Sequence, residues 1–140
     1  MVGIDGRKMS KSYDNTIVIF CGEKELKSKI ARIVTDATPI EAPKDPEKCN
    51  VFINISLFLN EEEKAELAAR YRKGGVRYSD VKKELFARLW EYFRPAREKR
   101  KQLEKDIDQI RAILKSGAEK ARAKAAPTLD LVRKRVGVAY

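Results

Sequence analysis

The sequence predicts a mainly α-helical protein, a helical bundle preceded by a mobile, basic loop. Apolar residues recur at spacings of three and four over most of the 140 residues, as they do on the buried face of helices. Signals that end helices, Gly74-Gly75 and Pro95, fall between these repeats. A hydrophobic content of 43% in a chain of this length can bury one modest core.

The segments after the loop differ in how clearly they predict structure. Residues 16–20 form a β-branched and apolar run, which predicts either a remnant of a strand or the beginning of the next helix. Residues 23–34 predict an amphipathic packing helix, with apolar positions Leu26, Ile30, Ile33 and Val34. Three prolines and several acidic residues within 36–46 predict an irregular connection.

Two further segments precede the middle of the chain. Residues 51–59 fit a strand or a buried helix equally well, so their periodicity alone does not decide between them. Asn60 followed by Glu63 is typical of a helix N-terminus, and Gly74-Gly75 is typical of its end, so we expect a helix over residues 60–73.

The second half predicts a core helix and then charged helices. Ser79 or Asp80 caps the core helix, whose apolar stripe is Val81, Leu85, Phe86, Leu89, Trp90 and Phe93. Pro95 predicts a kink or a break, followed by a charged helical stretch to residue 106. We expect a short helix over 107–114 that ends near Ser116-Gly117, and a last helix over 118–136 interrupted by Pro127.

Charge and composition limit the classes of partner. The chain has 31 Lys and Arg against 21 Asp and Glu, a net +10, which favours an anionic partner, usually nucleic acid. Histidine is absent and Cys21 and Cys49 lack metal-ligand spacing, so we predict no metal site and two reduced packing cysteines, with a disulfide as the lesser alternative. No apolar run is long enough to span a membrane and no signal peptide is present, so we expect a cytoplasmic protein without a membrane partner.

Residues 3–15 hold the residues with the clearest chemistry. Gly3 and Gly6 precede a run of cationic and hydroxyl side chains that suits polyphosphate binding. A solvated basic surface is the general alternative for such a run. Asp5 and Asp14 are interpreted as turn residues rather than as ligands of a metal ion.

The particular string decides between these interpretations. Lys8-Met9-Ser10-Lys11-Ser12 resembles the signature loop of class I aminoacyl-tRNA synthetases, and residues 3–7 resemble the run-in found in tryptophanyl-tRNA synthetases. Further blocks are similar to the carboxyl-terminal half of the bacterial enzymes, so the resemblance covers essentially the whole chain: Ile33-Val34-Thr35-Asp36, Cys49-Asn50-Val51-Phe52, Gly74-Gly75, Arg94-Pro95-Ala96-Arg97 and Gly117-Ala118-Glu119-Lys120-Ala121-Arg122. The similar segment in that family makes residues 51–59 helical.

The resemblance implies a chemistry for the loop. The family activates an amino acid with ATP, accompanied by Mg²⁺, and passes it to tRNA, here tRNA(Trp). By motif match Lys8 and Lys11 supply ammonium groups to the triphosphate, and Lys11 is expected to stabilise the transition state. Met9 lies against the adenine, while Ser10 and Ser12 support phosphate binding.

The resemblance also implies two parts. Residues 1–20 hold the loop and the end of the catalytic domain, and residues 21–140 form a helical domain that recognises the tRNA anticodon region. Candidate tRNA contacts are Arg94, Arg97, Arg100, Lys101, Arg111, Lys120, Arg122 and Lys124. For each of these taken alone, a solvated surface position is the favoured interpretation.

What is missing limits the expected activity. The family's histidine-containing nucleotide signature, its Rossmann-type half and its amino-acid pocket do not occur in a chain without histidine. We therefore expect no tryptophan activation by this chain alone, contact with tryptophan only through the missing half, and a monomer although the parent enzyme is a homodimer. Two alternatives are a non-catalytic, synthetase-derived RNA-binding module and a helical interaction protein whose charge serves solubility.

Overall fold

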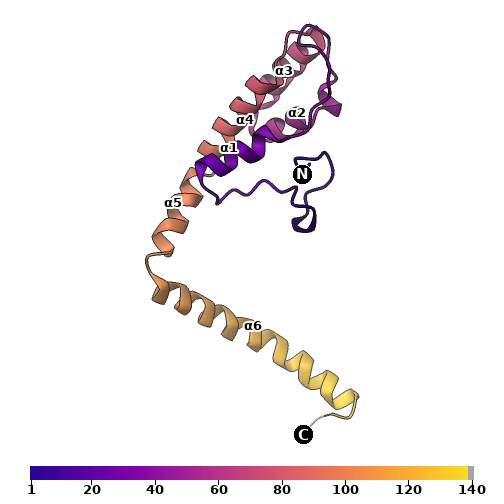
Figure 1. Ribbon diagram of the computed structural model, residues 1–140. Coiled ribbons are helices and arrows are strands. Elements are labelled where there is room, and N and C mark those ends of the chain that lie inside the picture. The colour runs from indigo at the N-terminus through magenta and orange to yellow at the C-terminus, as the bar shows by residue number, and fades with distance from the viewer. Residues whose placement is uncertain (139–140) are drawn as a thin grey trace. The chain divides into compact units, whose positions relative to one another are not determined.

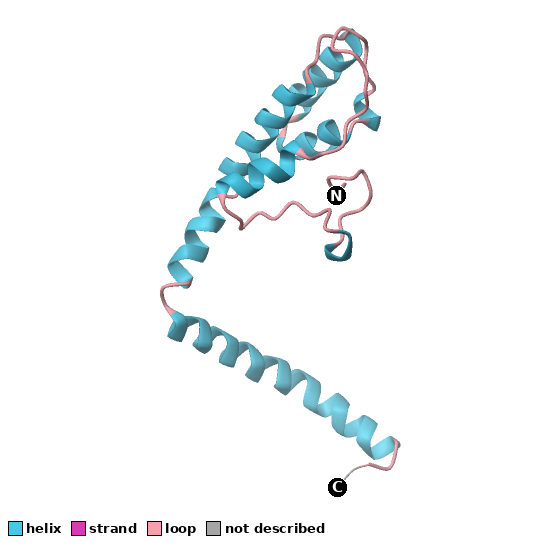
Figure 2. Cartoon of the chain, in the orientation of Figure 1, coloured by secondary structure: helices cyan, strands magenta, loops and turns pink. Residues whose placement is uncertain are grey.

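The computed structural model describes residues 1–138 and forms two compact units, residues 1–95 and the residues from 96 onward. Every named element within the described residues is helical (Figures 1 and 2). An isolated antiparallel bridge between Val2 and Lys8 is the only strand-like pairing in that range. The predicted mainly α-helical class is confirmed.

The first unit is built around four helices joined by short 3₁₀ turns. These helices are α1 (Glu23–Ala31), α2 (Asn50–Ile55), α3 (Glu61–Lys73) and α4 (Tyr78–Tyr92), and the turns are η1 (Lys11–Tyr13), η2 (Pro46–Lys48) and η3 (Ser56–Phe58). Helix α4 packs against both α1 and α2 and so lies at the centre of the unit. The fully buried side chains come from all four helices and include Leu26, Val51, Ile55, Tyr71 and Leu85.

Two predictions about the middle of the chain are confirmed. Residues 50–58 are helical as α2 and η3, since Val51, Phe52 and Ile55 all point into the core. A complete capping box starts α3: the Glu63 N–H donates to Asn60 Oδ1 at 2.8 Å, and the Asn60 N–H donates to Glu63 Oε2 at 2.9 Å. Gly74 ends α3 with φ +90°, where a Cβ would collide with the Glu41 carbonyl oxygen.

Three predicted boundaries are wrong. Residues 16–20 are neither strand nor helix: Ile17 and Ile19 pack on the core, but no strand lies beside them within residues 1–138. Helix α1 ends at Ala31 rather than residue 34, because the Val34 N–H turns back to donate to the Ile4 carbonyl at 2.7 Å. Helix α4 begins at Tyr78, before the expected caps, since the Asp80 and Val81 N–H groups already donate to the Arg77 carbonyl.

The expected irregular connection over residues 36–46 is confirmed, and a buried lysine organises it. Lys44 is 5% exposed, and its ammonium donates to the carbonyls of Pro39, Ile40 and Ala42 at 2.6, 3.1 and 3.1 Å. The same ammonium lies 5.5 Å from the centre of the Tyr78 ring. Lys44 therefore acts as an internal cation that gathers carbonyls no helix could pair.

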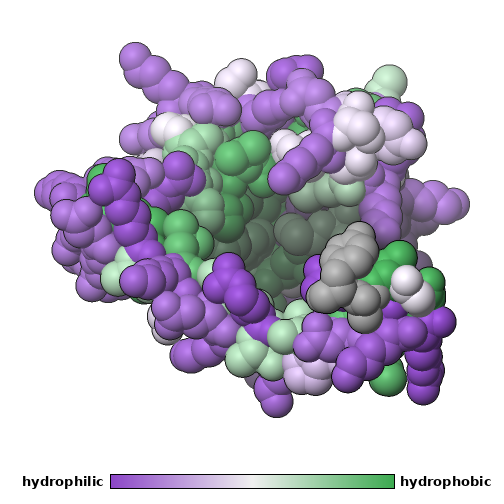
Figure 3. All heavy atoms as spheres, turned by 90° about the horizontal axis from the view of Figure 1, so that it is seen from below, coloured by the Kyte–Doolittle hydropathy of each residue, from purple (hydrophilic) through white to green (hydrophobic). Residues whose placement is uncertain are grey.

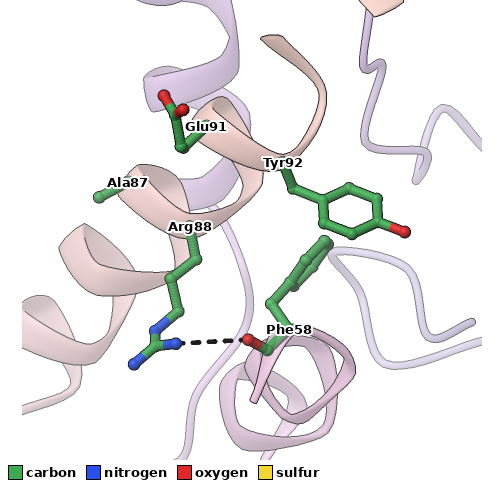
Figure 4. Close-up of a pocket in the computed structure, with 5 residues that line it drawn as sticks. All are labelled: Phe58, Ala87, Arg88, Glu91 and Tyr92. Atoms are coloured by element: carbon green, nitrogen blue, oxygen red, sulfur yellow. Dashed lines mark hydrogen bonds between the residues drawn. The ribbon is translucent and has the colours of Figure 1, made fainter. Parts of the chain in front are cut away.

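Arg88 ties α3, η3 and α4 together beside a pocket of about 460 Å³ (Figure 4). Its guanidinium donates to the Phe58 carbonyl at 3.3 Å and forms ion pairs with Glu63 at 2.8 Å and Glu84 at 3.0 Å. Hydrogen bonds from Arg88 and from the Asn60 backbone lower the pKa of Glu63. One side chain thus supports the capping box of α3 from the neighbouring helix.

The charged second half contains α5 (Arg94–Leu103) and α6 (Ile107–Arg135). Helices α4 and α5 are separated at Phe93, two residues before Pro95, so the predicted break is present. The expected division at Ser116-Gly117 is wrong, since α6 runs without interruption through both Gly117 and Pro127. Gly117 and Pro127 disfavour a helix interior, through backbone entropy and through a lost hydrogen bond, but here they weaken α6 without ending it.

Helix α6 has no buried residue, and its apolar residues other than the half-buried Ile110 are exposed. Ile113, Leu114 and Val132 are 58%, 67% and 49% exposed. Hydrophobic residues are also visible among mostly hydrophilic ones on the face of the molecule drawn in Figure 3. Separately, no helix within residues 1–138 has the length and apolar character needed to cross a membrane.

Candidate functional site

The basic loop begins with a narrow reversal of the chain. The Gly3 N–H donates to the Arg7 carbonyl at 2.7 Å and the Gly6 N–H to the Gly3 carbonyl at 3.1 Å, which closes a turn between the two glycines. Gly6 adopts φ +85°, a conformation that side chains disfavour, so glycine is required there. The Met9 N–H donates to the Met1 carbonyl at 3.2 Å and extends the pairing beyond Lys8.

Asn15 closes the loop from inside. Its side chain is 1% exposed and makes three hydrogen bonds: Oδ1 accepts from the Ser10 N–H at 2.7 Å, and Nδ2 donates to Asp5 Oδ1 at 2.8 Å and to the Lys8 carbonyl at 3.1 Å. One amide therefore contacts the residues on both sides of Met9. Together these bonds hold Lys8 and Ser10 at fixed positions along the loop.

The hydrogen bonds of Asn15 to Ser10, Asp5 and Lys8, which we call the clasp, require the backbone to approach closely at Gly3. A Cβ on Gly3 would lie 2.6 Å from Asn15 Nδ2 and 2.7 Å from the Asn15 carbonyl oxygen, so no side chain fits there. The Ile4 N–H donates to that carbonyl at 3.0 Å, and the Ile4 carbonyl accepts from Val34 beyond α1. The backbone of Ile4 thereby joins the loop to the segment that follows α1.

The cationic and hydroxyl side chains predicted for the site point outward. Lys8, Lys11 and Ser12 are exposed, whereas Met9 and Ser10 are half-buried. The Ser10 and Ser12 hydroxyls lie 2.9 Å apart, on either side of the start of η1. Neither loop lysine forms an ion pair within the described residues, so both ammonium groups are available to an anion. The structure thus brings together the five predicted loop residues on one short segment.

The two carboxylates near the loop are already engaged. Asp5 pairs with Arg7 at 2.7 Å, and hydrogen bonds from Asn15 and Arg7 lower the pKa of Asp5 to about 2 despite its partial desolvation. Asp14 has φ +47° at the end of η1 and pairs with Lys29 at 2.8 Å, which lowers its pKa. Both carboxylates serve the loop's own structure, as turn residues do.

The side chains of the loop therefore suit a polyphosphate better than a magnesium ion. Among residues 1–138 no three His, Cys, Asp or Glu side chains form a group that could hold a metal ion. The loop instead offers ammonium and hydroxyl groups, which suit phosphate oxygens. A magnesium ion that accompanies ATP would take its protein ligands, if any, from elsewhere.

Three of the arginines that are predicted to contact tRNA form ion pairs with neighbouring carboxylates. Arg94 pairs with Glu91 at 2.9 Å, Arg100 with Glu104 at 2.7 Å and Arg111 with Asp108 at 3.2 Å. Arg97 is only 9% exposed, which argues against a role in surface binding. Lys101 remains exposed on α5.

The candidates on α6 divide between two sides of that helix. Arg111 and Arg122 are eleven residues apart, which is about three full turns, so they share one side. Lys120 and Lys124 share a different side, one turn apart. All four are exposed, so α6 offers positive charge around its circumference instead of along one stripe.

Sequence reasoning missed the residues that hold the loop. Asn15 and Lys29 had no predicted role, and Asp5 was interpreted only as a turn residue. A buried asparagine directly after a basic loop carries a weak signal, because asparagine is common in turns for reasons of backbone conformation alone.

Comparison with known proteins places these features in a family. Residues 1–94 match the model of the class I tRNA synthetases (W and Y). The chain is 46% identical over 136 residues to a tryptophan–tRNA ligase from Rhodopirellula baltica, covering 97% of this chain and 42% of that protein. A tryptophan–tRNA ligase from Campylobacter jejuni is also 46% identical, over 138 residues, with 99% and 43% coverage.

A solved structure is also similar to this chain. The tryptophanyl-tRNA synthetase from Campylobacter jejuni complexed with ADP and tryptophan superposes with a TM-score of 0.84 at 46% identity, over 97% of this chain and 43% of that chain. The chain thus spans about two fifths of the length of these relatives. On the match over residues 1–94, the chain belongs to the class I tRNA synthetases of the W and Y type.

Proposed function

We propose that the chain is the part of a tryptophan–tRNA ligase that supplies the ATP-contacting loop and a helical tRNA-recognition domain. The observation that carries this proposal is the clasped loop, in which Lys8 and Lys11 stand exposed without ion pairs while Asn15 holds the backbone between them. Tryptophan is proposed as the amino acid because the relatives at 46% identity are tryptophan–tRNA ligases. The division of roles falls near residue 20, between the loop and the helices.

The proposed chemistry uses the loop for electrostatic stabilisation. In amino-acid activation a carboxylate oxygen attacks the α-phosphorus of ATP, the bond to the bridging oxygen breaks, and pyrophosphate leaves with the electron pair. Negative charge grows on the leaving group, so a positioned ammonium stabilises the transition state more than the ground state. Lys11 takes this role, Lys8 binds the triphosphate, Ser10 and Ser12 donate to its oxygens, and Met9 contacts the adenine. Mg²⁺ supplies further charge neutralisation when it is bound with ATP.

The remaining substrates meet other surfaces. The helices from residue 21 onward contact tRNA(Trp), to which the aminoacyl group is transferred. We assign tryptophan binding, the histidine-containing nucleotide signature and the dimer interface to the part of a full-length ligase that this chain does not cover. A chain without histidine therefore activates no tryptophan by itself and works in the cytoplasm together with that part.

Reconstitution tests the catalytic proposal. The chain is mixed with the complementary part of a relative, and tryptophan-dependent exchange between ATP and pyrophosphate is measured. We expect exchange only with both parts present, and a loss of at least about 100-fold in Lys11→Ala, as for removal of one transition-state donor. Lys24→Ala, an exposed lysine on α1, is the matched control and should keep full exchange. Full exchange by Lys11→Ala would refute the role assigned to Lys11.

A second candidate is a non-catalytic RNA-binding module, favoured by the net charge of +10 and the exposed cations around α6. It predicts salt-dependent tRNA binding that ATP leaves unchanged. Failure of exchange in every mixture, combined with such binding, would support this module and exclude the ligase.

A further inference from the structure

A groove of about 730 Å³ lies between α1 and α4, away from the basic loop. Its volume is within the range of about 300–1,000 Å³ that is usual for small-ligand sites. Residues from α1, from α4 and from the segment between α1 and η2 line it: Lys27, Ile30, Ala31, Thr35, Tyr78, Ser79, Lys82, Lys83 and Phe86. The lining combines apolar and aromatic side chains with three lysines, and no acidic residue is among the residues that line it.

One lysine of the groove has no carboxylate partner among residues 1–138. Lys27 pairs with Glu23 and Lys83 with Asp80, but the Lys82 ammonium donates to the Ala31 carbonyl at 2.8 Å. That carbonyl belongs to the last residue of α1, so a helix end holds the ammonium at the groove. Burial lowers the pKa of Lys82, which is the cost that an anion entering the groove would offset.

An aromatic ring faces the same space. Phe86 lies one turn beyond Lys82 on α4, and its ring stacks with Trp90 at 5.9 Å between centroids and 19° between planes. The Lys27 ammonium lies 4.9 Å from the centre of the Phe86 ring. This ammonium belongs to an exposed side chain, so a flat aromatic ligand can displace it and use the Phe86 ring as a platform.

We propose that this groove binds one unpaired nucleotide of an RNA strand, with the base against Phe86 and the adjoining phosphate on Lys82. Single-stranded RNA is the ligand class that needs an aromatic platform beside a cation, because its bases are free to stack. The paired bases of a duplex are not free to enter a groove of this size. The inference rests on the proposed tRNA-binding function and names a site for it.

The test measures binding of a fluorescein-labelled RNA hairpin with a seven-nucleotide loop, by anisotropy, at several salt concentrations. Lys82→Gln should weaken binding and reduce the slope of log K against log salt by about 0.7, the value for one phosphate of a single strand. Phe86→Leu should weaken binding at least about fivefold, as expected for loss of one stacked base, and leave the salt slope unchanged. Lys24→Gln removes the same charge from the same unit outside the groove and should change neither quantity appreciably.

The outcomes separate this inference from the proposed function. No binding of the hairpin by the unchanged chain at a low salt concentration of about 50 mM would refute both. Normal binding by the unchanged chain, with the same affinity and the same salt slope in Lys82→Gln and Lys24→Gln, would refute the groove alone. Equal affinity for a loop-free duplex, or for a hexaglutamate peptide, would also refute it, since neither offers a free base. Thermal unfolding followed by circular dichroism checks that Phe86→Leu is folded, and Lys82→Gln tests the site independently of that ring.

Discussion

The side-chain oxygen of Asn15 accepts a hydrogen bond of 2.7 Å from the backbone N–H of Ser10, inside a loop whose Lys8, Lys11 and Ser12 side chains are exposed. The same amide donates to Asp5 and to the Lys8 carbonyl. The loop is therefore supported from inside by Asn15, in addition to the backbone hydrogen bond from Met9 to Met1. Its predicted mobility stays a prediction, but these are the bonds that any opening must break.

Asn15→Ala should free the loop. Loss of three hydrogen bonds from a buried amide should destabilise the loop by about 1–3 kcal/mol and accelerate amide hydrogen exchange at Ser10. The Leu85 amide, in the core helix, reports global unfolding and shows whether the change is confined to the loop. Ser12→Ala, which removes only an exposed hydroxyl contact, is the control. Unchanged exchange at Ser10 in Asn15→Ala would mean that the clasp does not hold the loop.

The clasp should also depend on pH through Asp5. Its pKa is lowered from 3.8 to about 2, first by the hydrogen bond from Asn15. A carboxylate with a lowered folded-state pKa stabilises the fold above its unfolded pKa, and that contribution is lost as pH falls toward the folded value. We therefore expect the loop to loosen between about pH 4 and pH 2.

Titration of the Asp5 carboxyl carbon by NMR measures this directly. In Asn15→Ala the pKa of Asp5 should rise toward its usual value, because the largest cause of the shift is gone. Asp5→Asn should remove the part of this pH dependence that comes from Asp5, whereas Asp14, whose pKa the Lys29 ion pair also lowers, keeps its own. A pKa of Asp5 that does not respond to Asn15→Ala would contradict the arrangement.

Lys44 should be worth more to stability than its charge suggests. Lys44→Met keeps the aliphatic stem but leaves the carbonyls of Pro39, Ile40 and Ala42 without their shared donor. We expect a loss of about 2 kcal/mol or more in the free energy of unfolding, measured with urea. Lys48→Met is the control: Lys48 is 87% exposed and its ion pair with Asp45 spans 3.7 Å, so its removal should change stability by less than about 0.5 kcal/mol. Equal losses of unfolding free energy in Lys44→Met and Lys48→Met would show that the hydrogen bonds from Lys44 to the three carbonyls do not contribute to stability.

Particular residues show how far the sequence could predict this structure. Local signals succeeded where the physics is local: Asn60 with Glu63 gave a capping box, and Gly74 ended its helix. They failed where contacts with residues far away in the sequence determine the structure. The end of α1 depends on a hydrogen bond to Ile4, which no pattern within residues 23–34 contains.

The candidate site shows the same division. The motif predicted the five loop residues, because their side chains carry the chemistry and lie together in sequence. It could not predict that Arg97 would be nearly buried, or that Lys82 and Phe86 would line a groove with α1, since both depend on tertiary packing.

Helix α6 offers the last test, because its helicity depends on local preference. No residue of α6 is buried within the described structure, yet the helix contains Pro127, which cannot donate to the Ala123 carbonyl. A proline inside a helix costs about 3 kcal/mol relative to alanine. Pro127→Ala should therefore increase the helical circular dichroism signal at about 222 nm and slow amide exchange on both sides of residue 127. Pro43→Ala, an exposed proline in the irregular connection, should leave the signal unchanged. If Pro127→Ala left both the dichroism signal and the exchange unchanged, α6 would already be fully helical despite the proline. Its stability would then not depend on local helix preference.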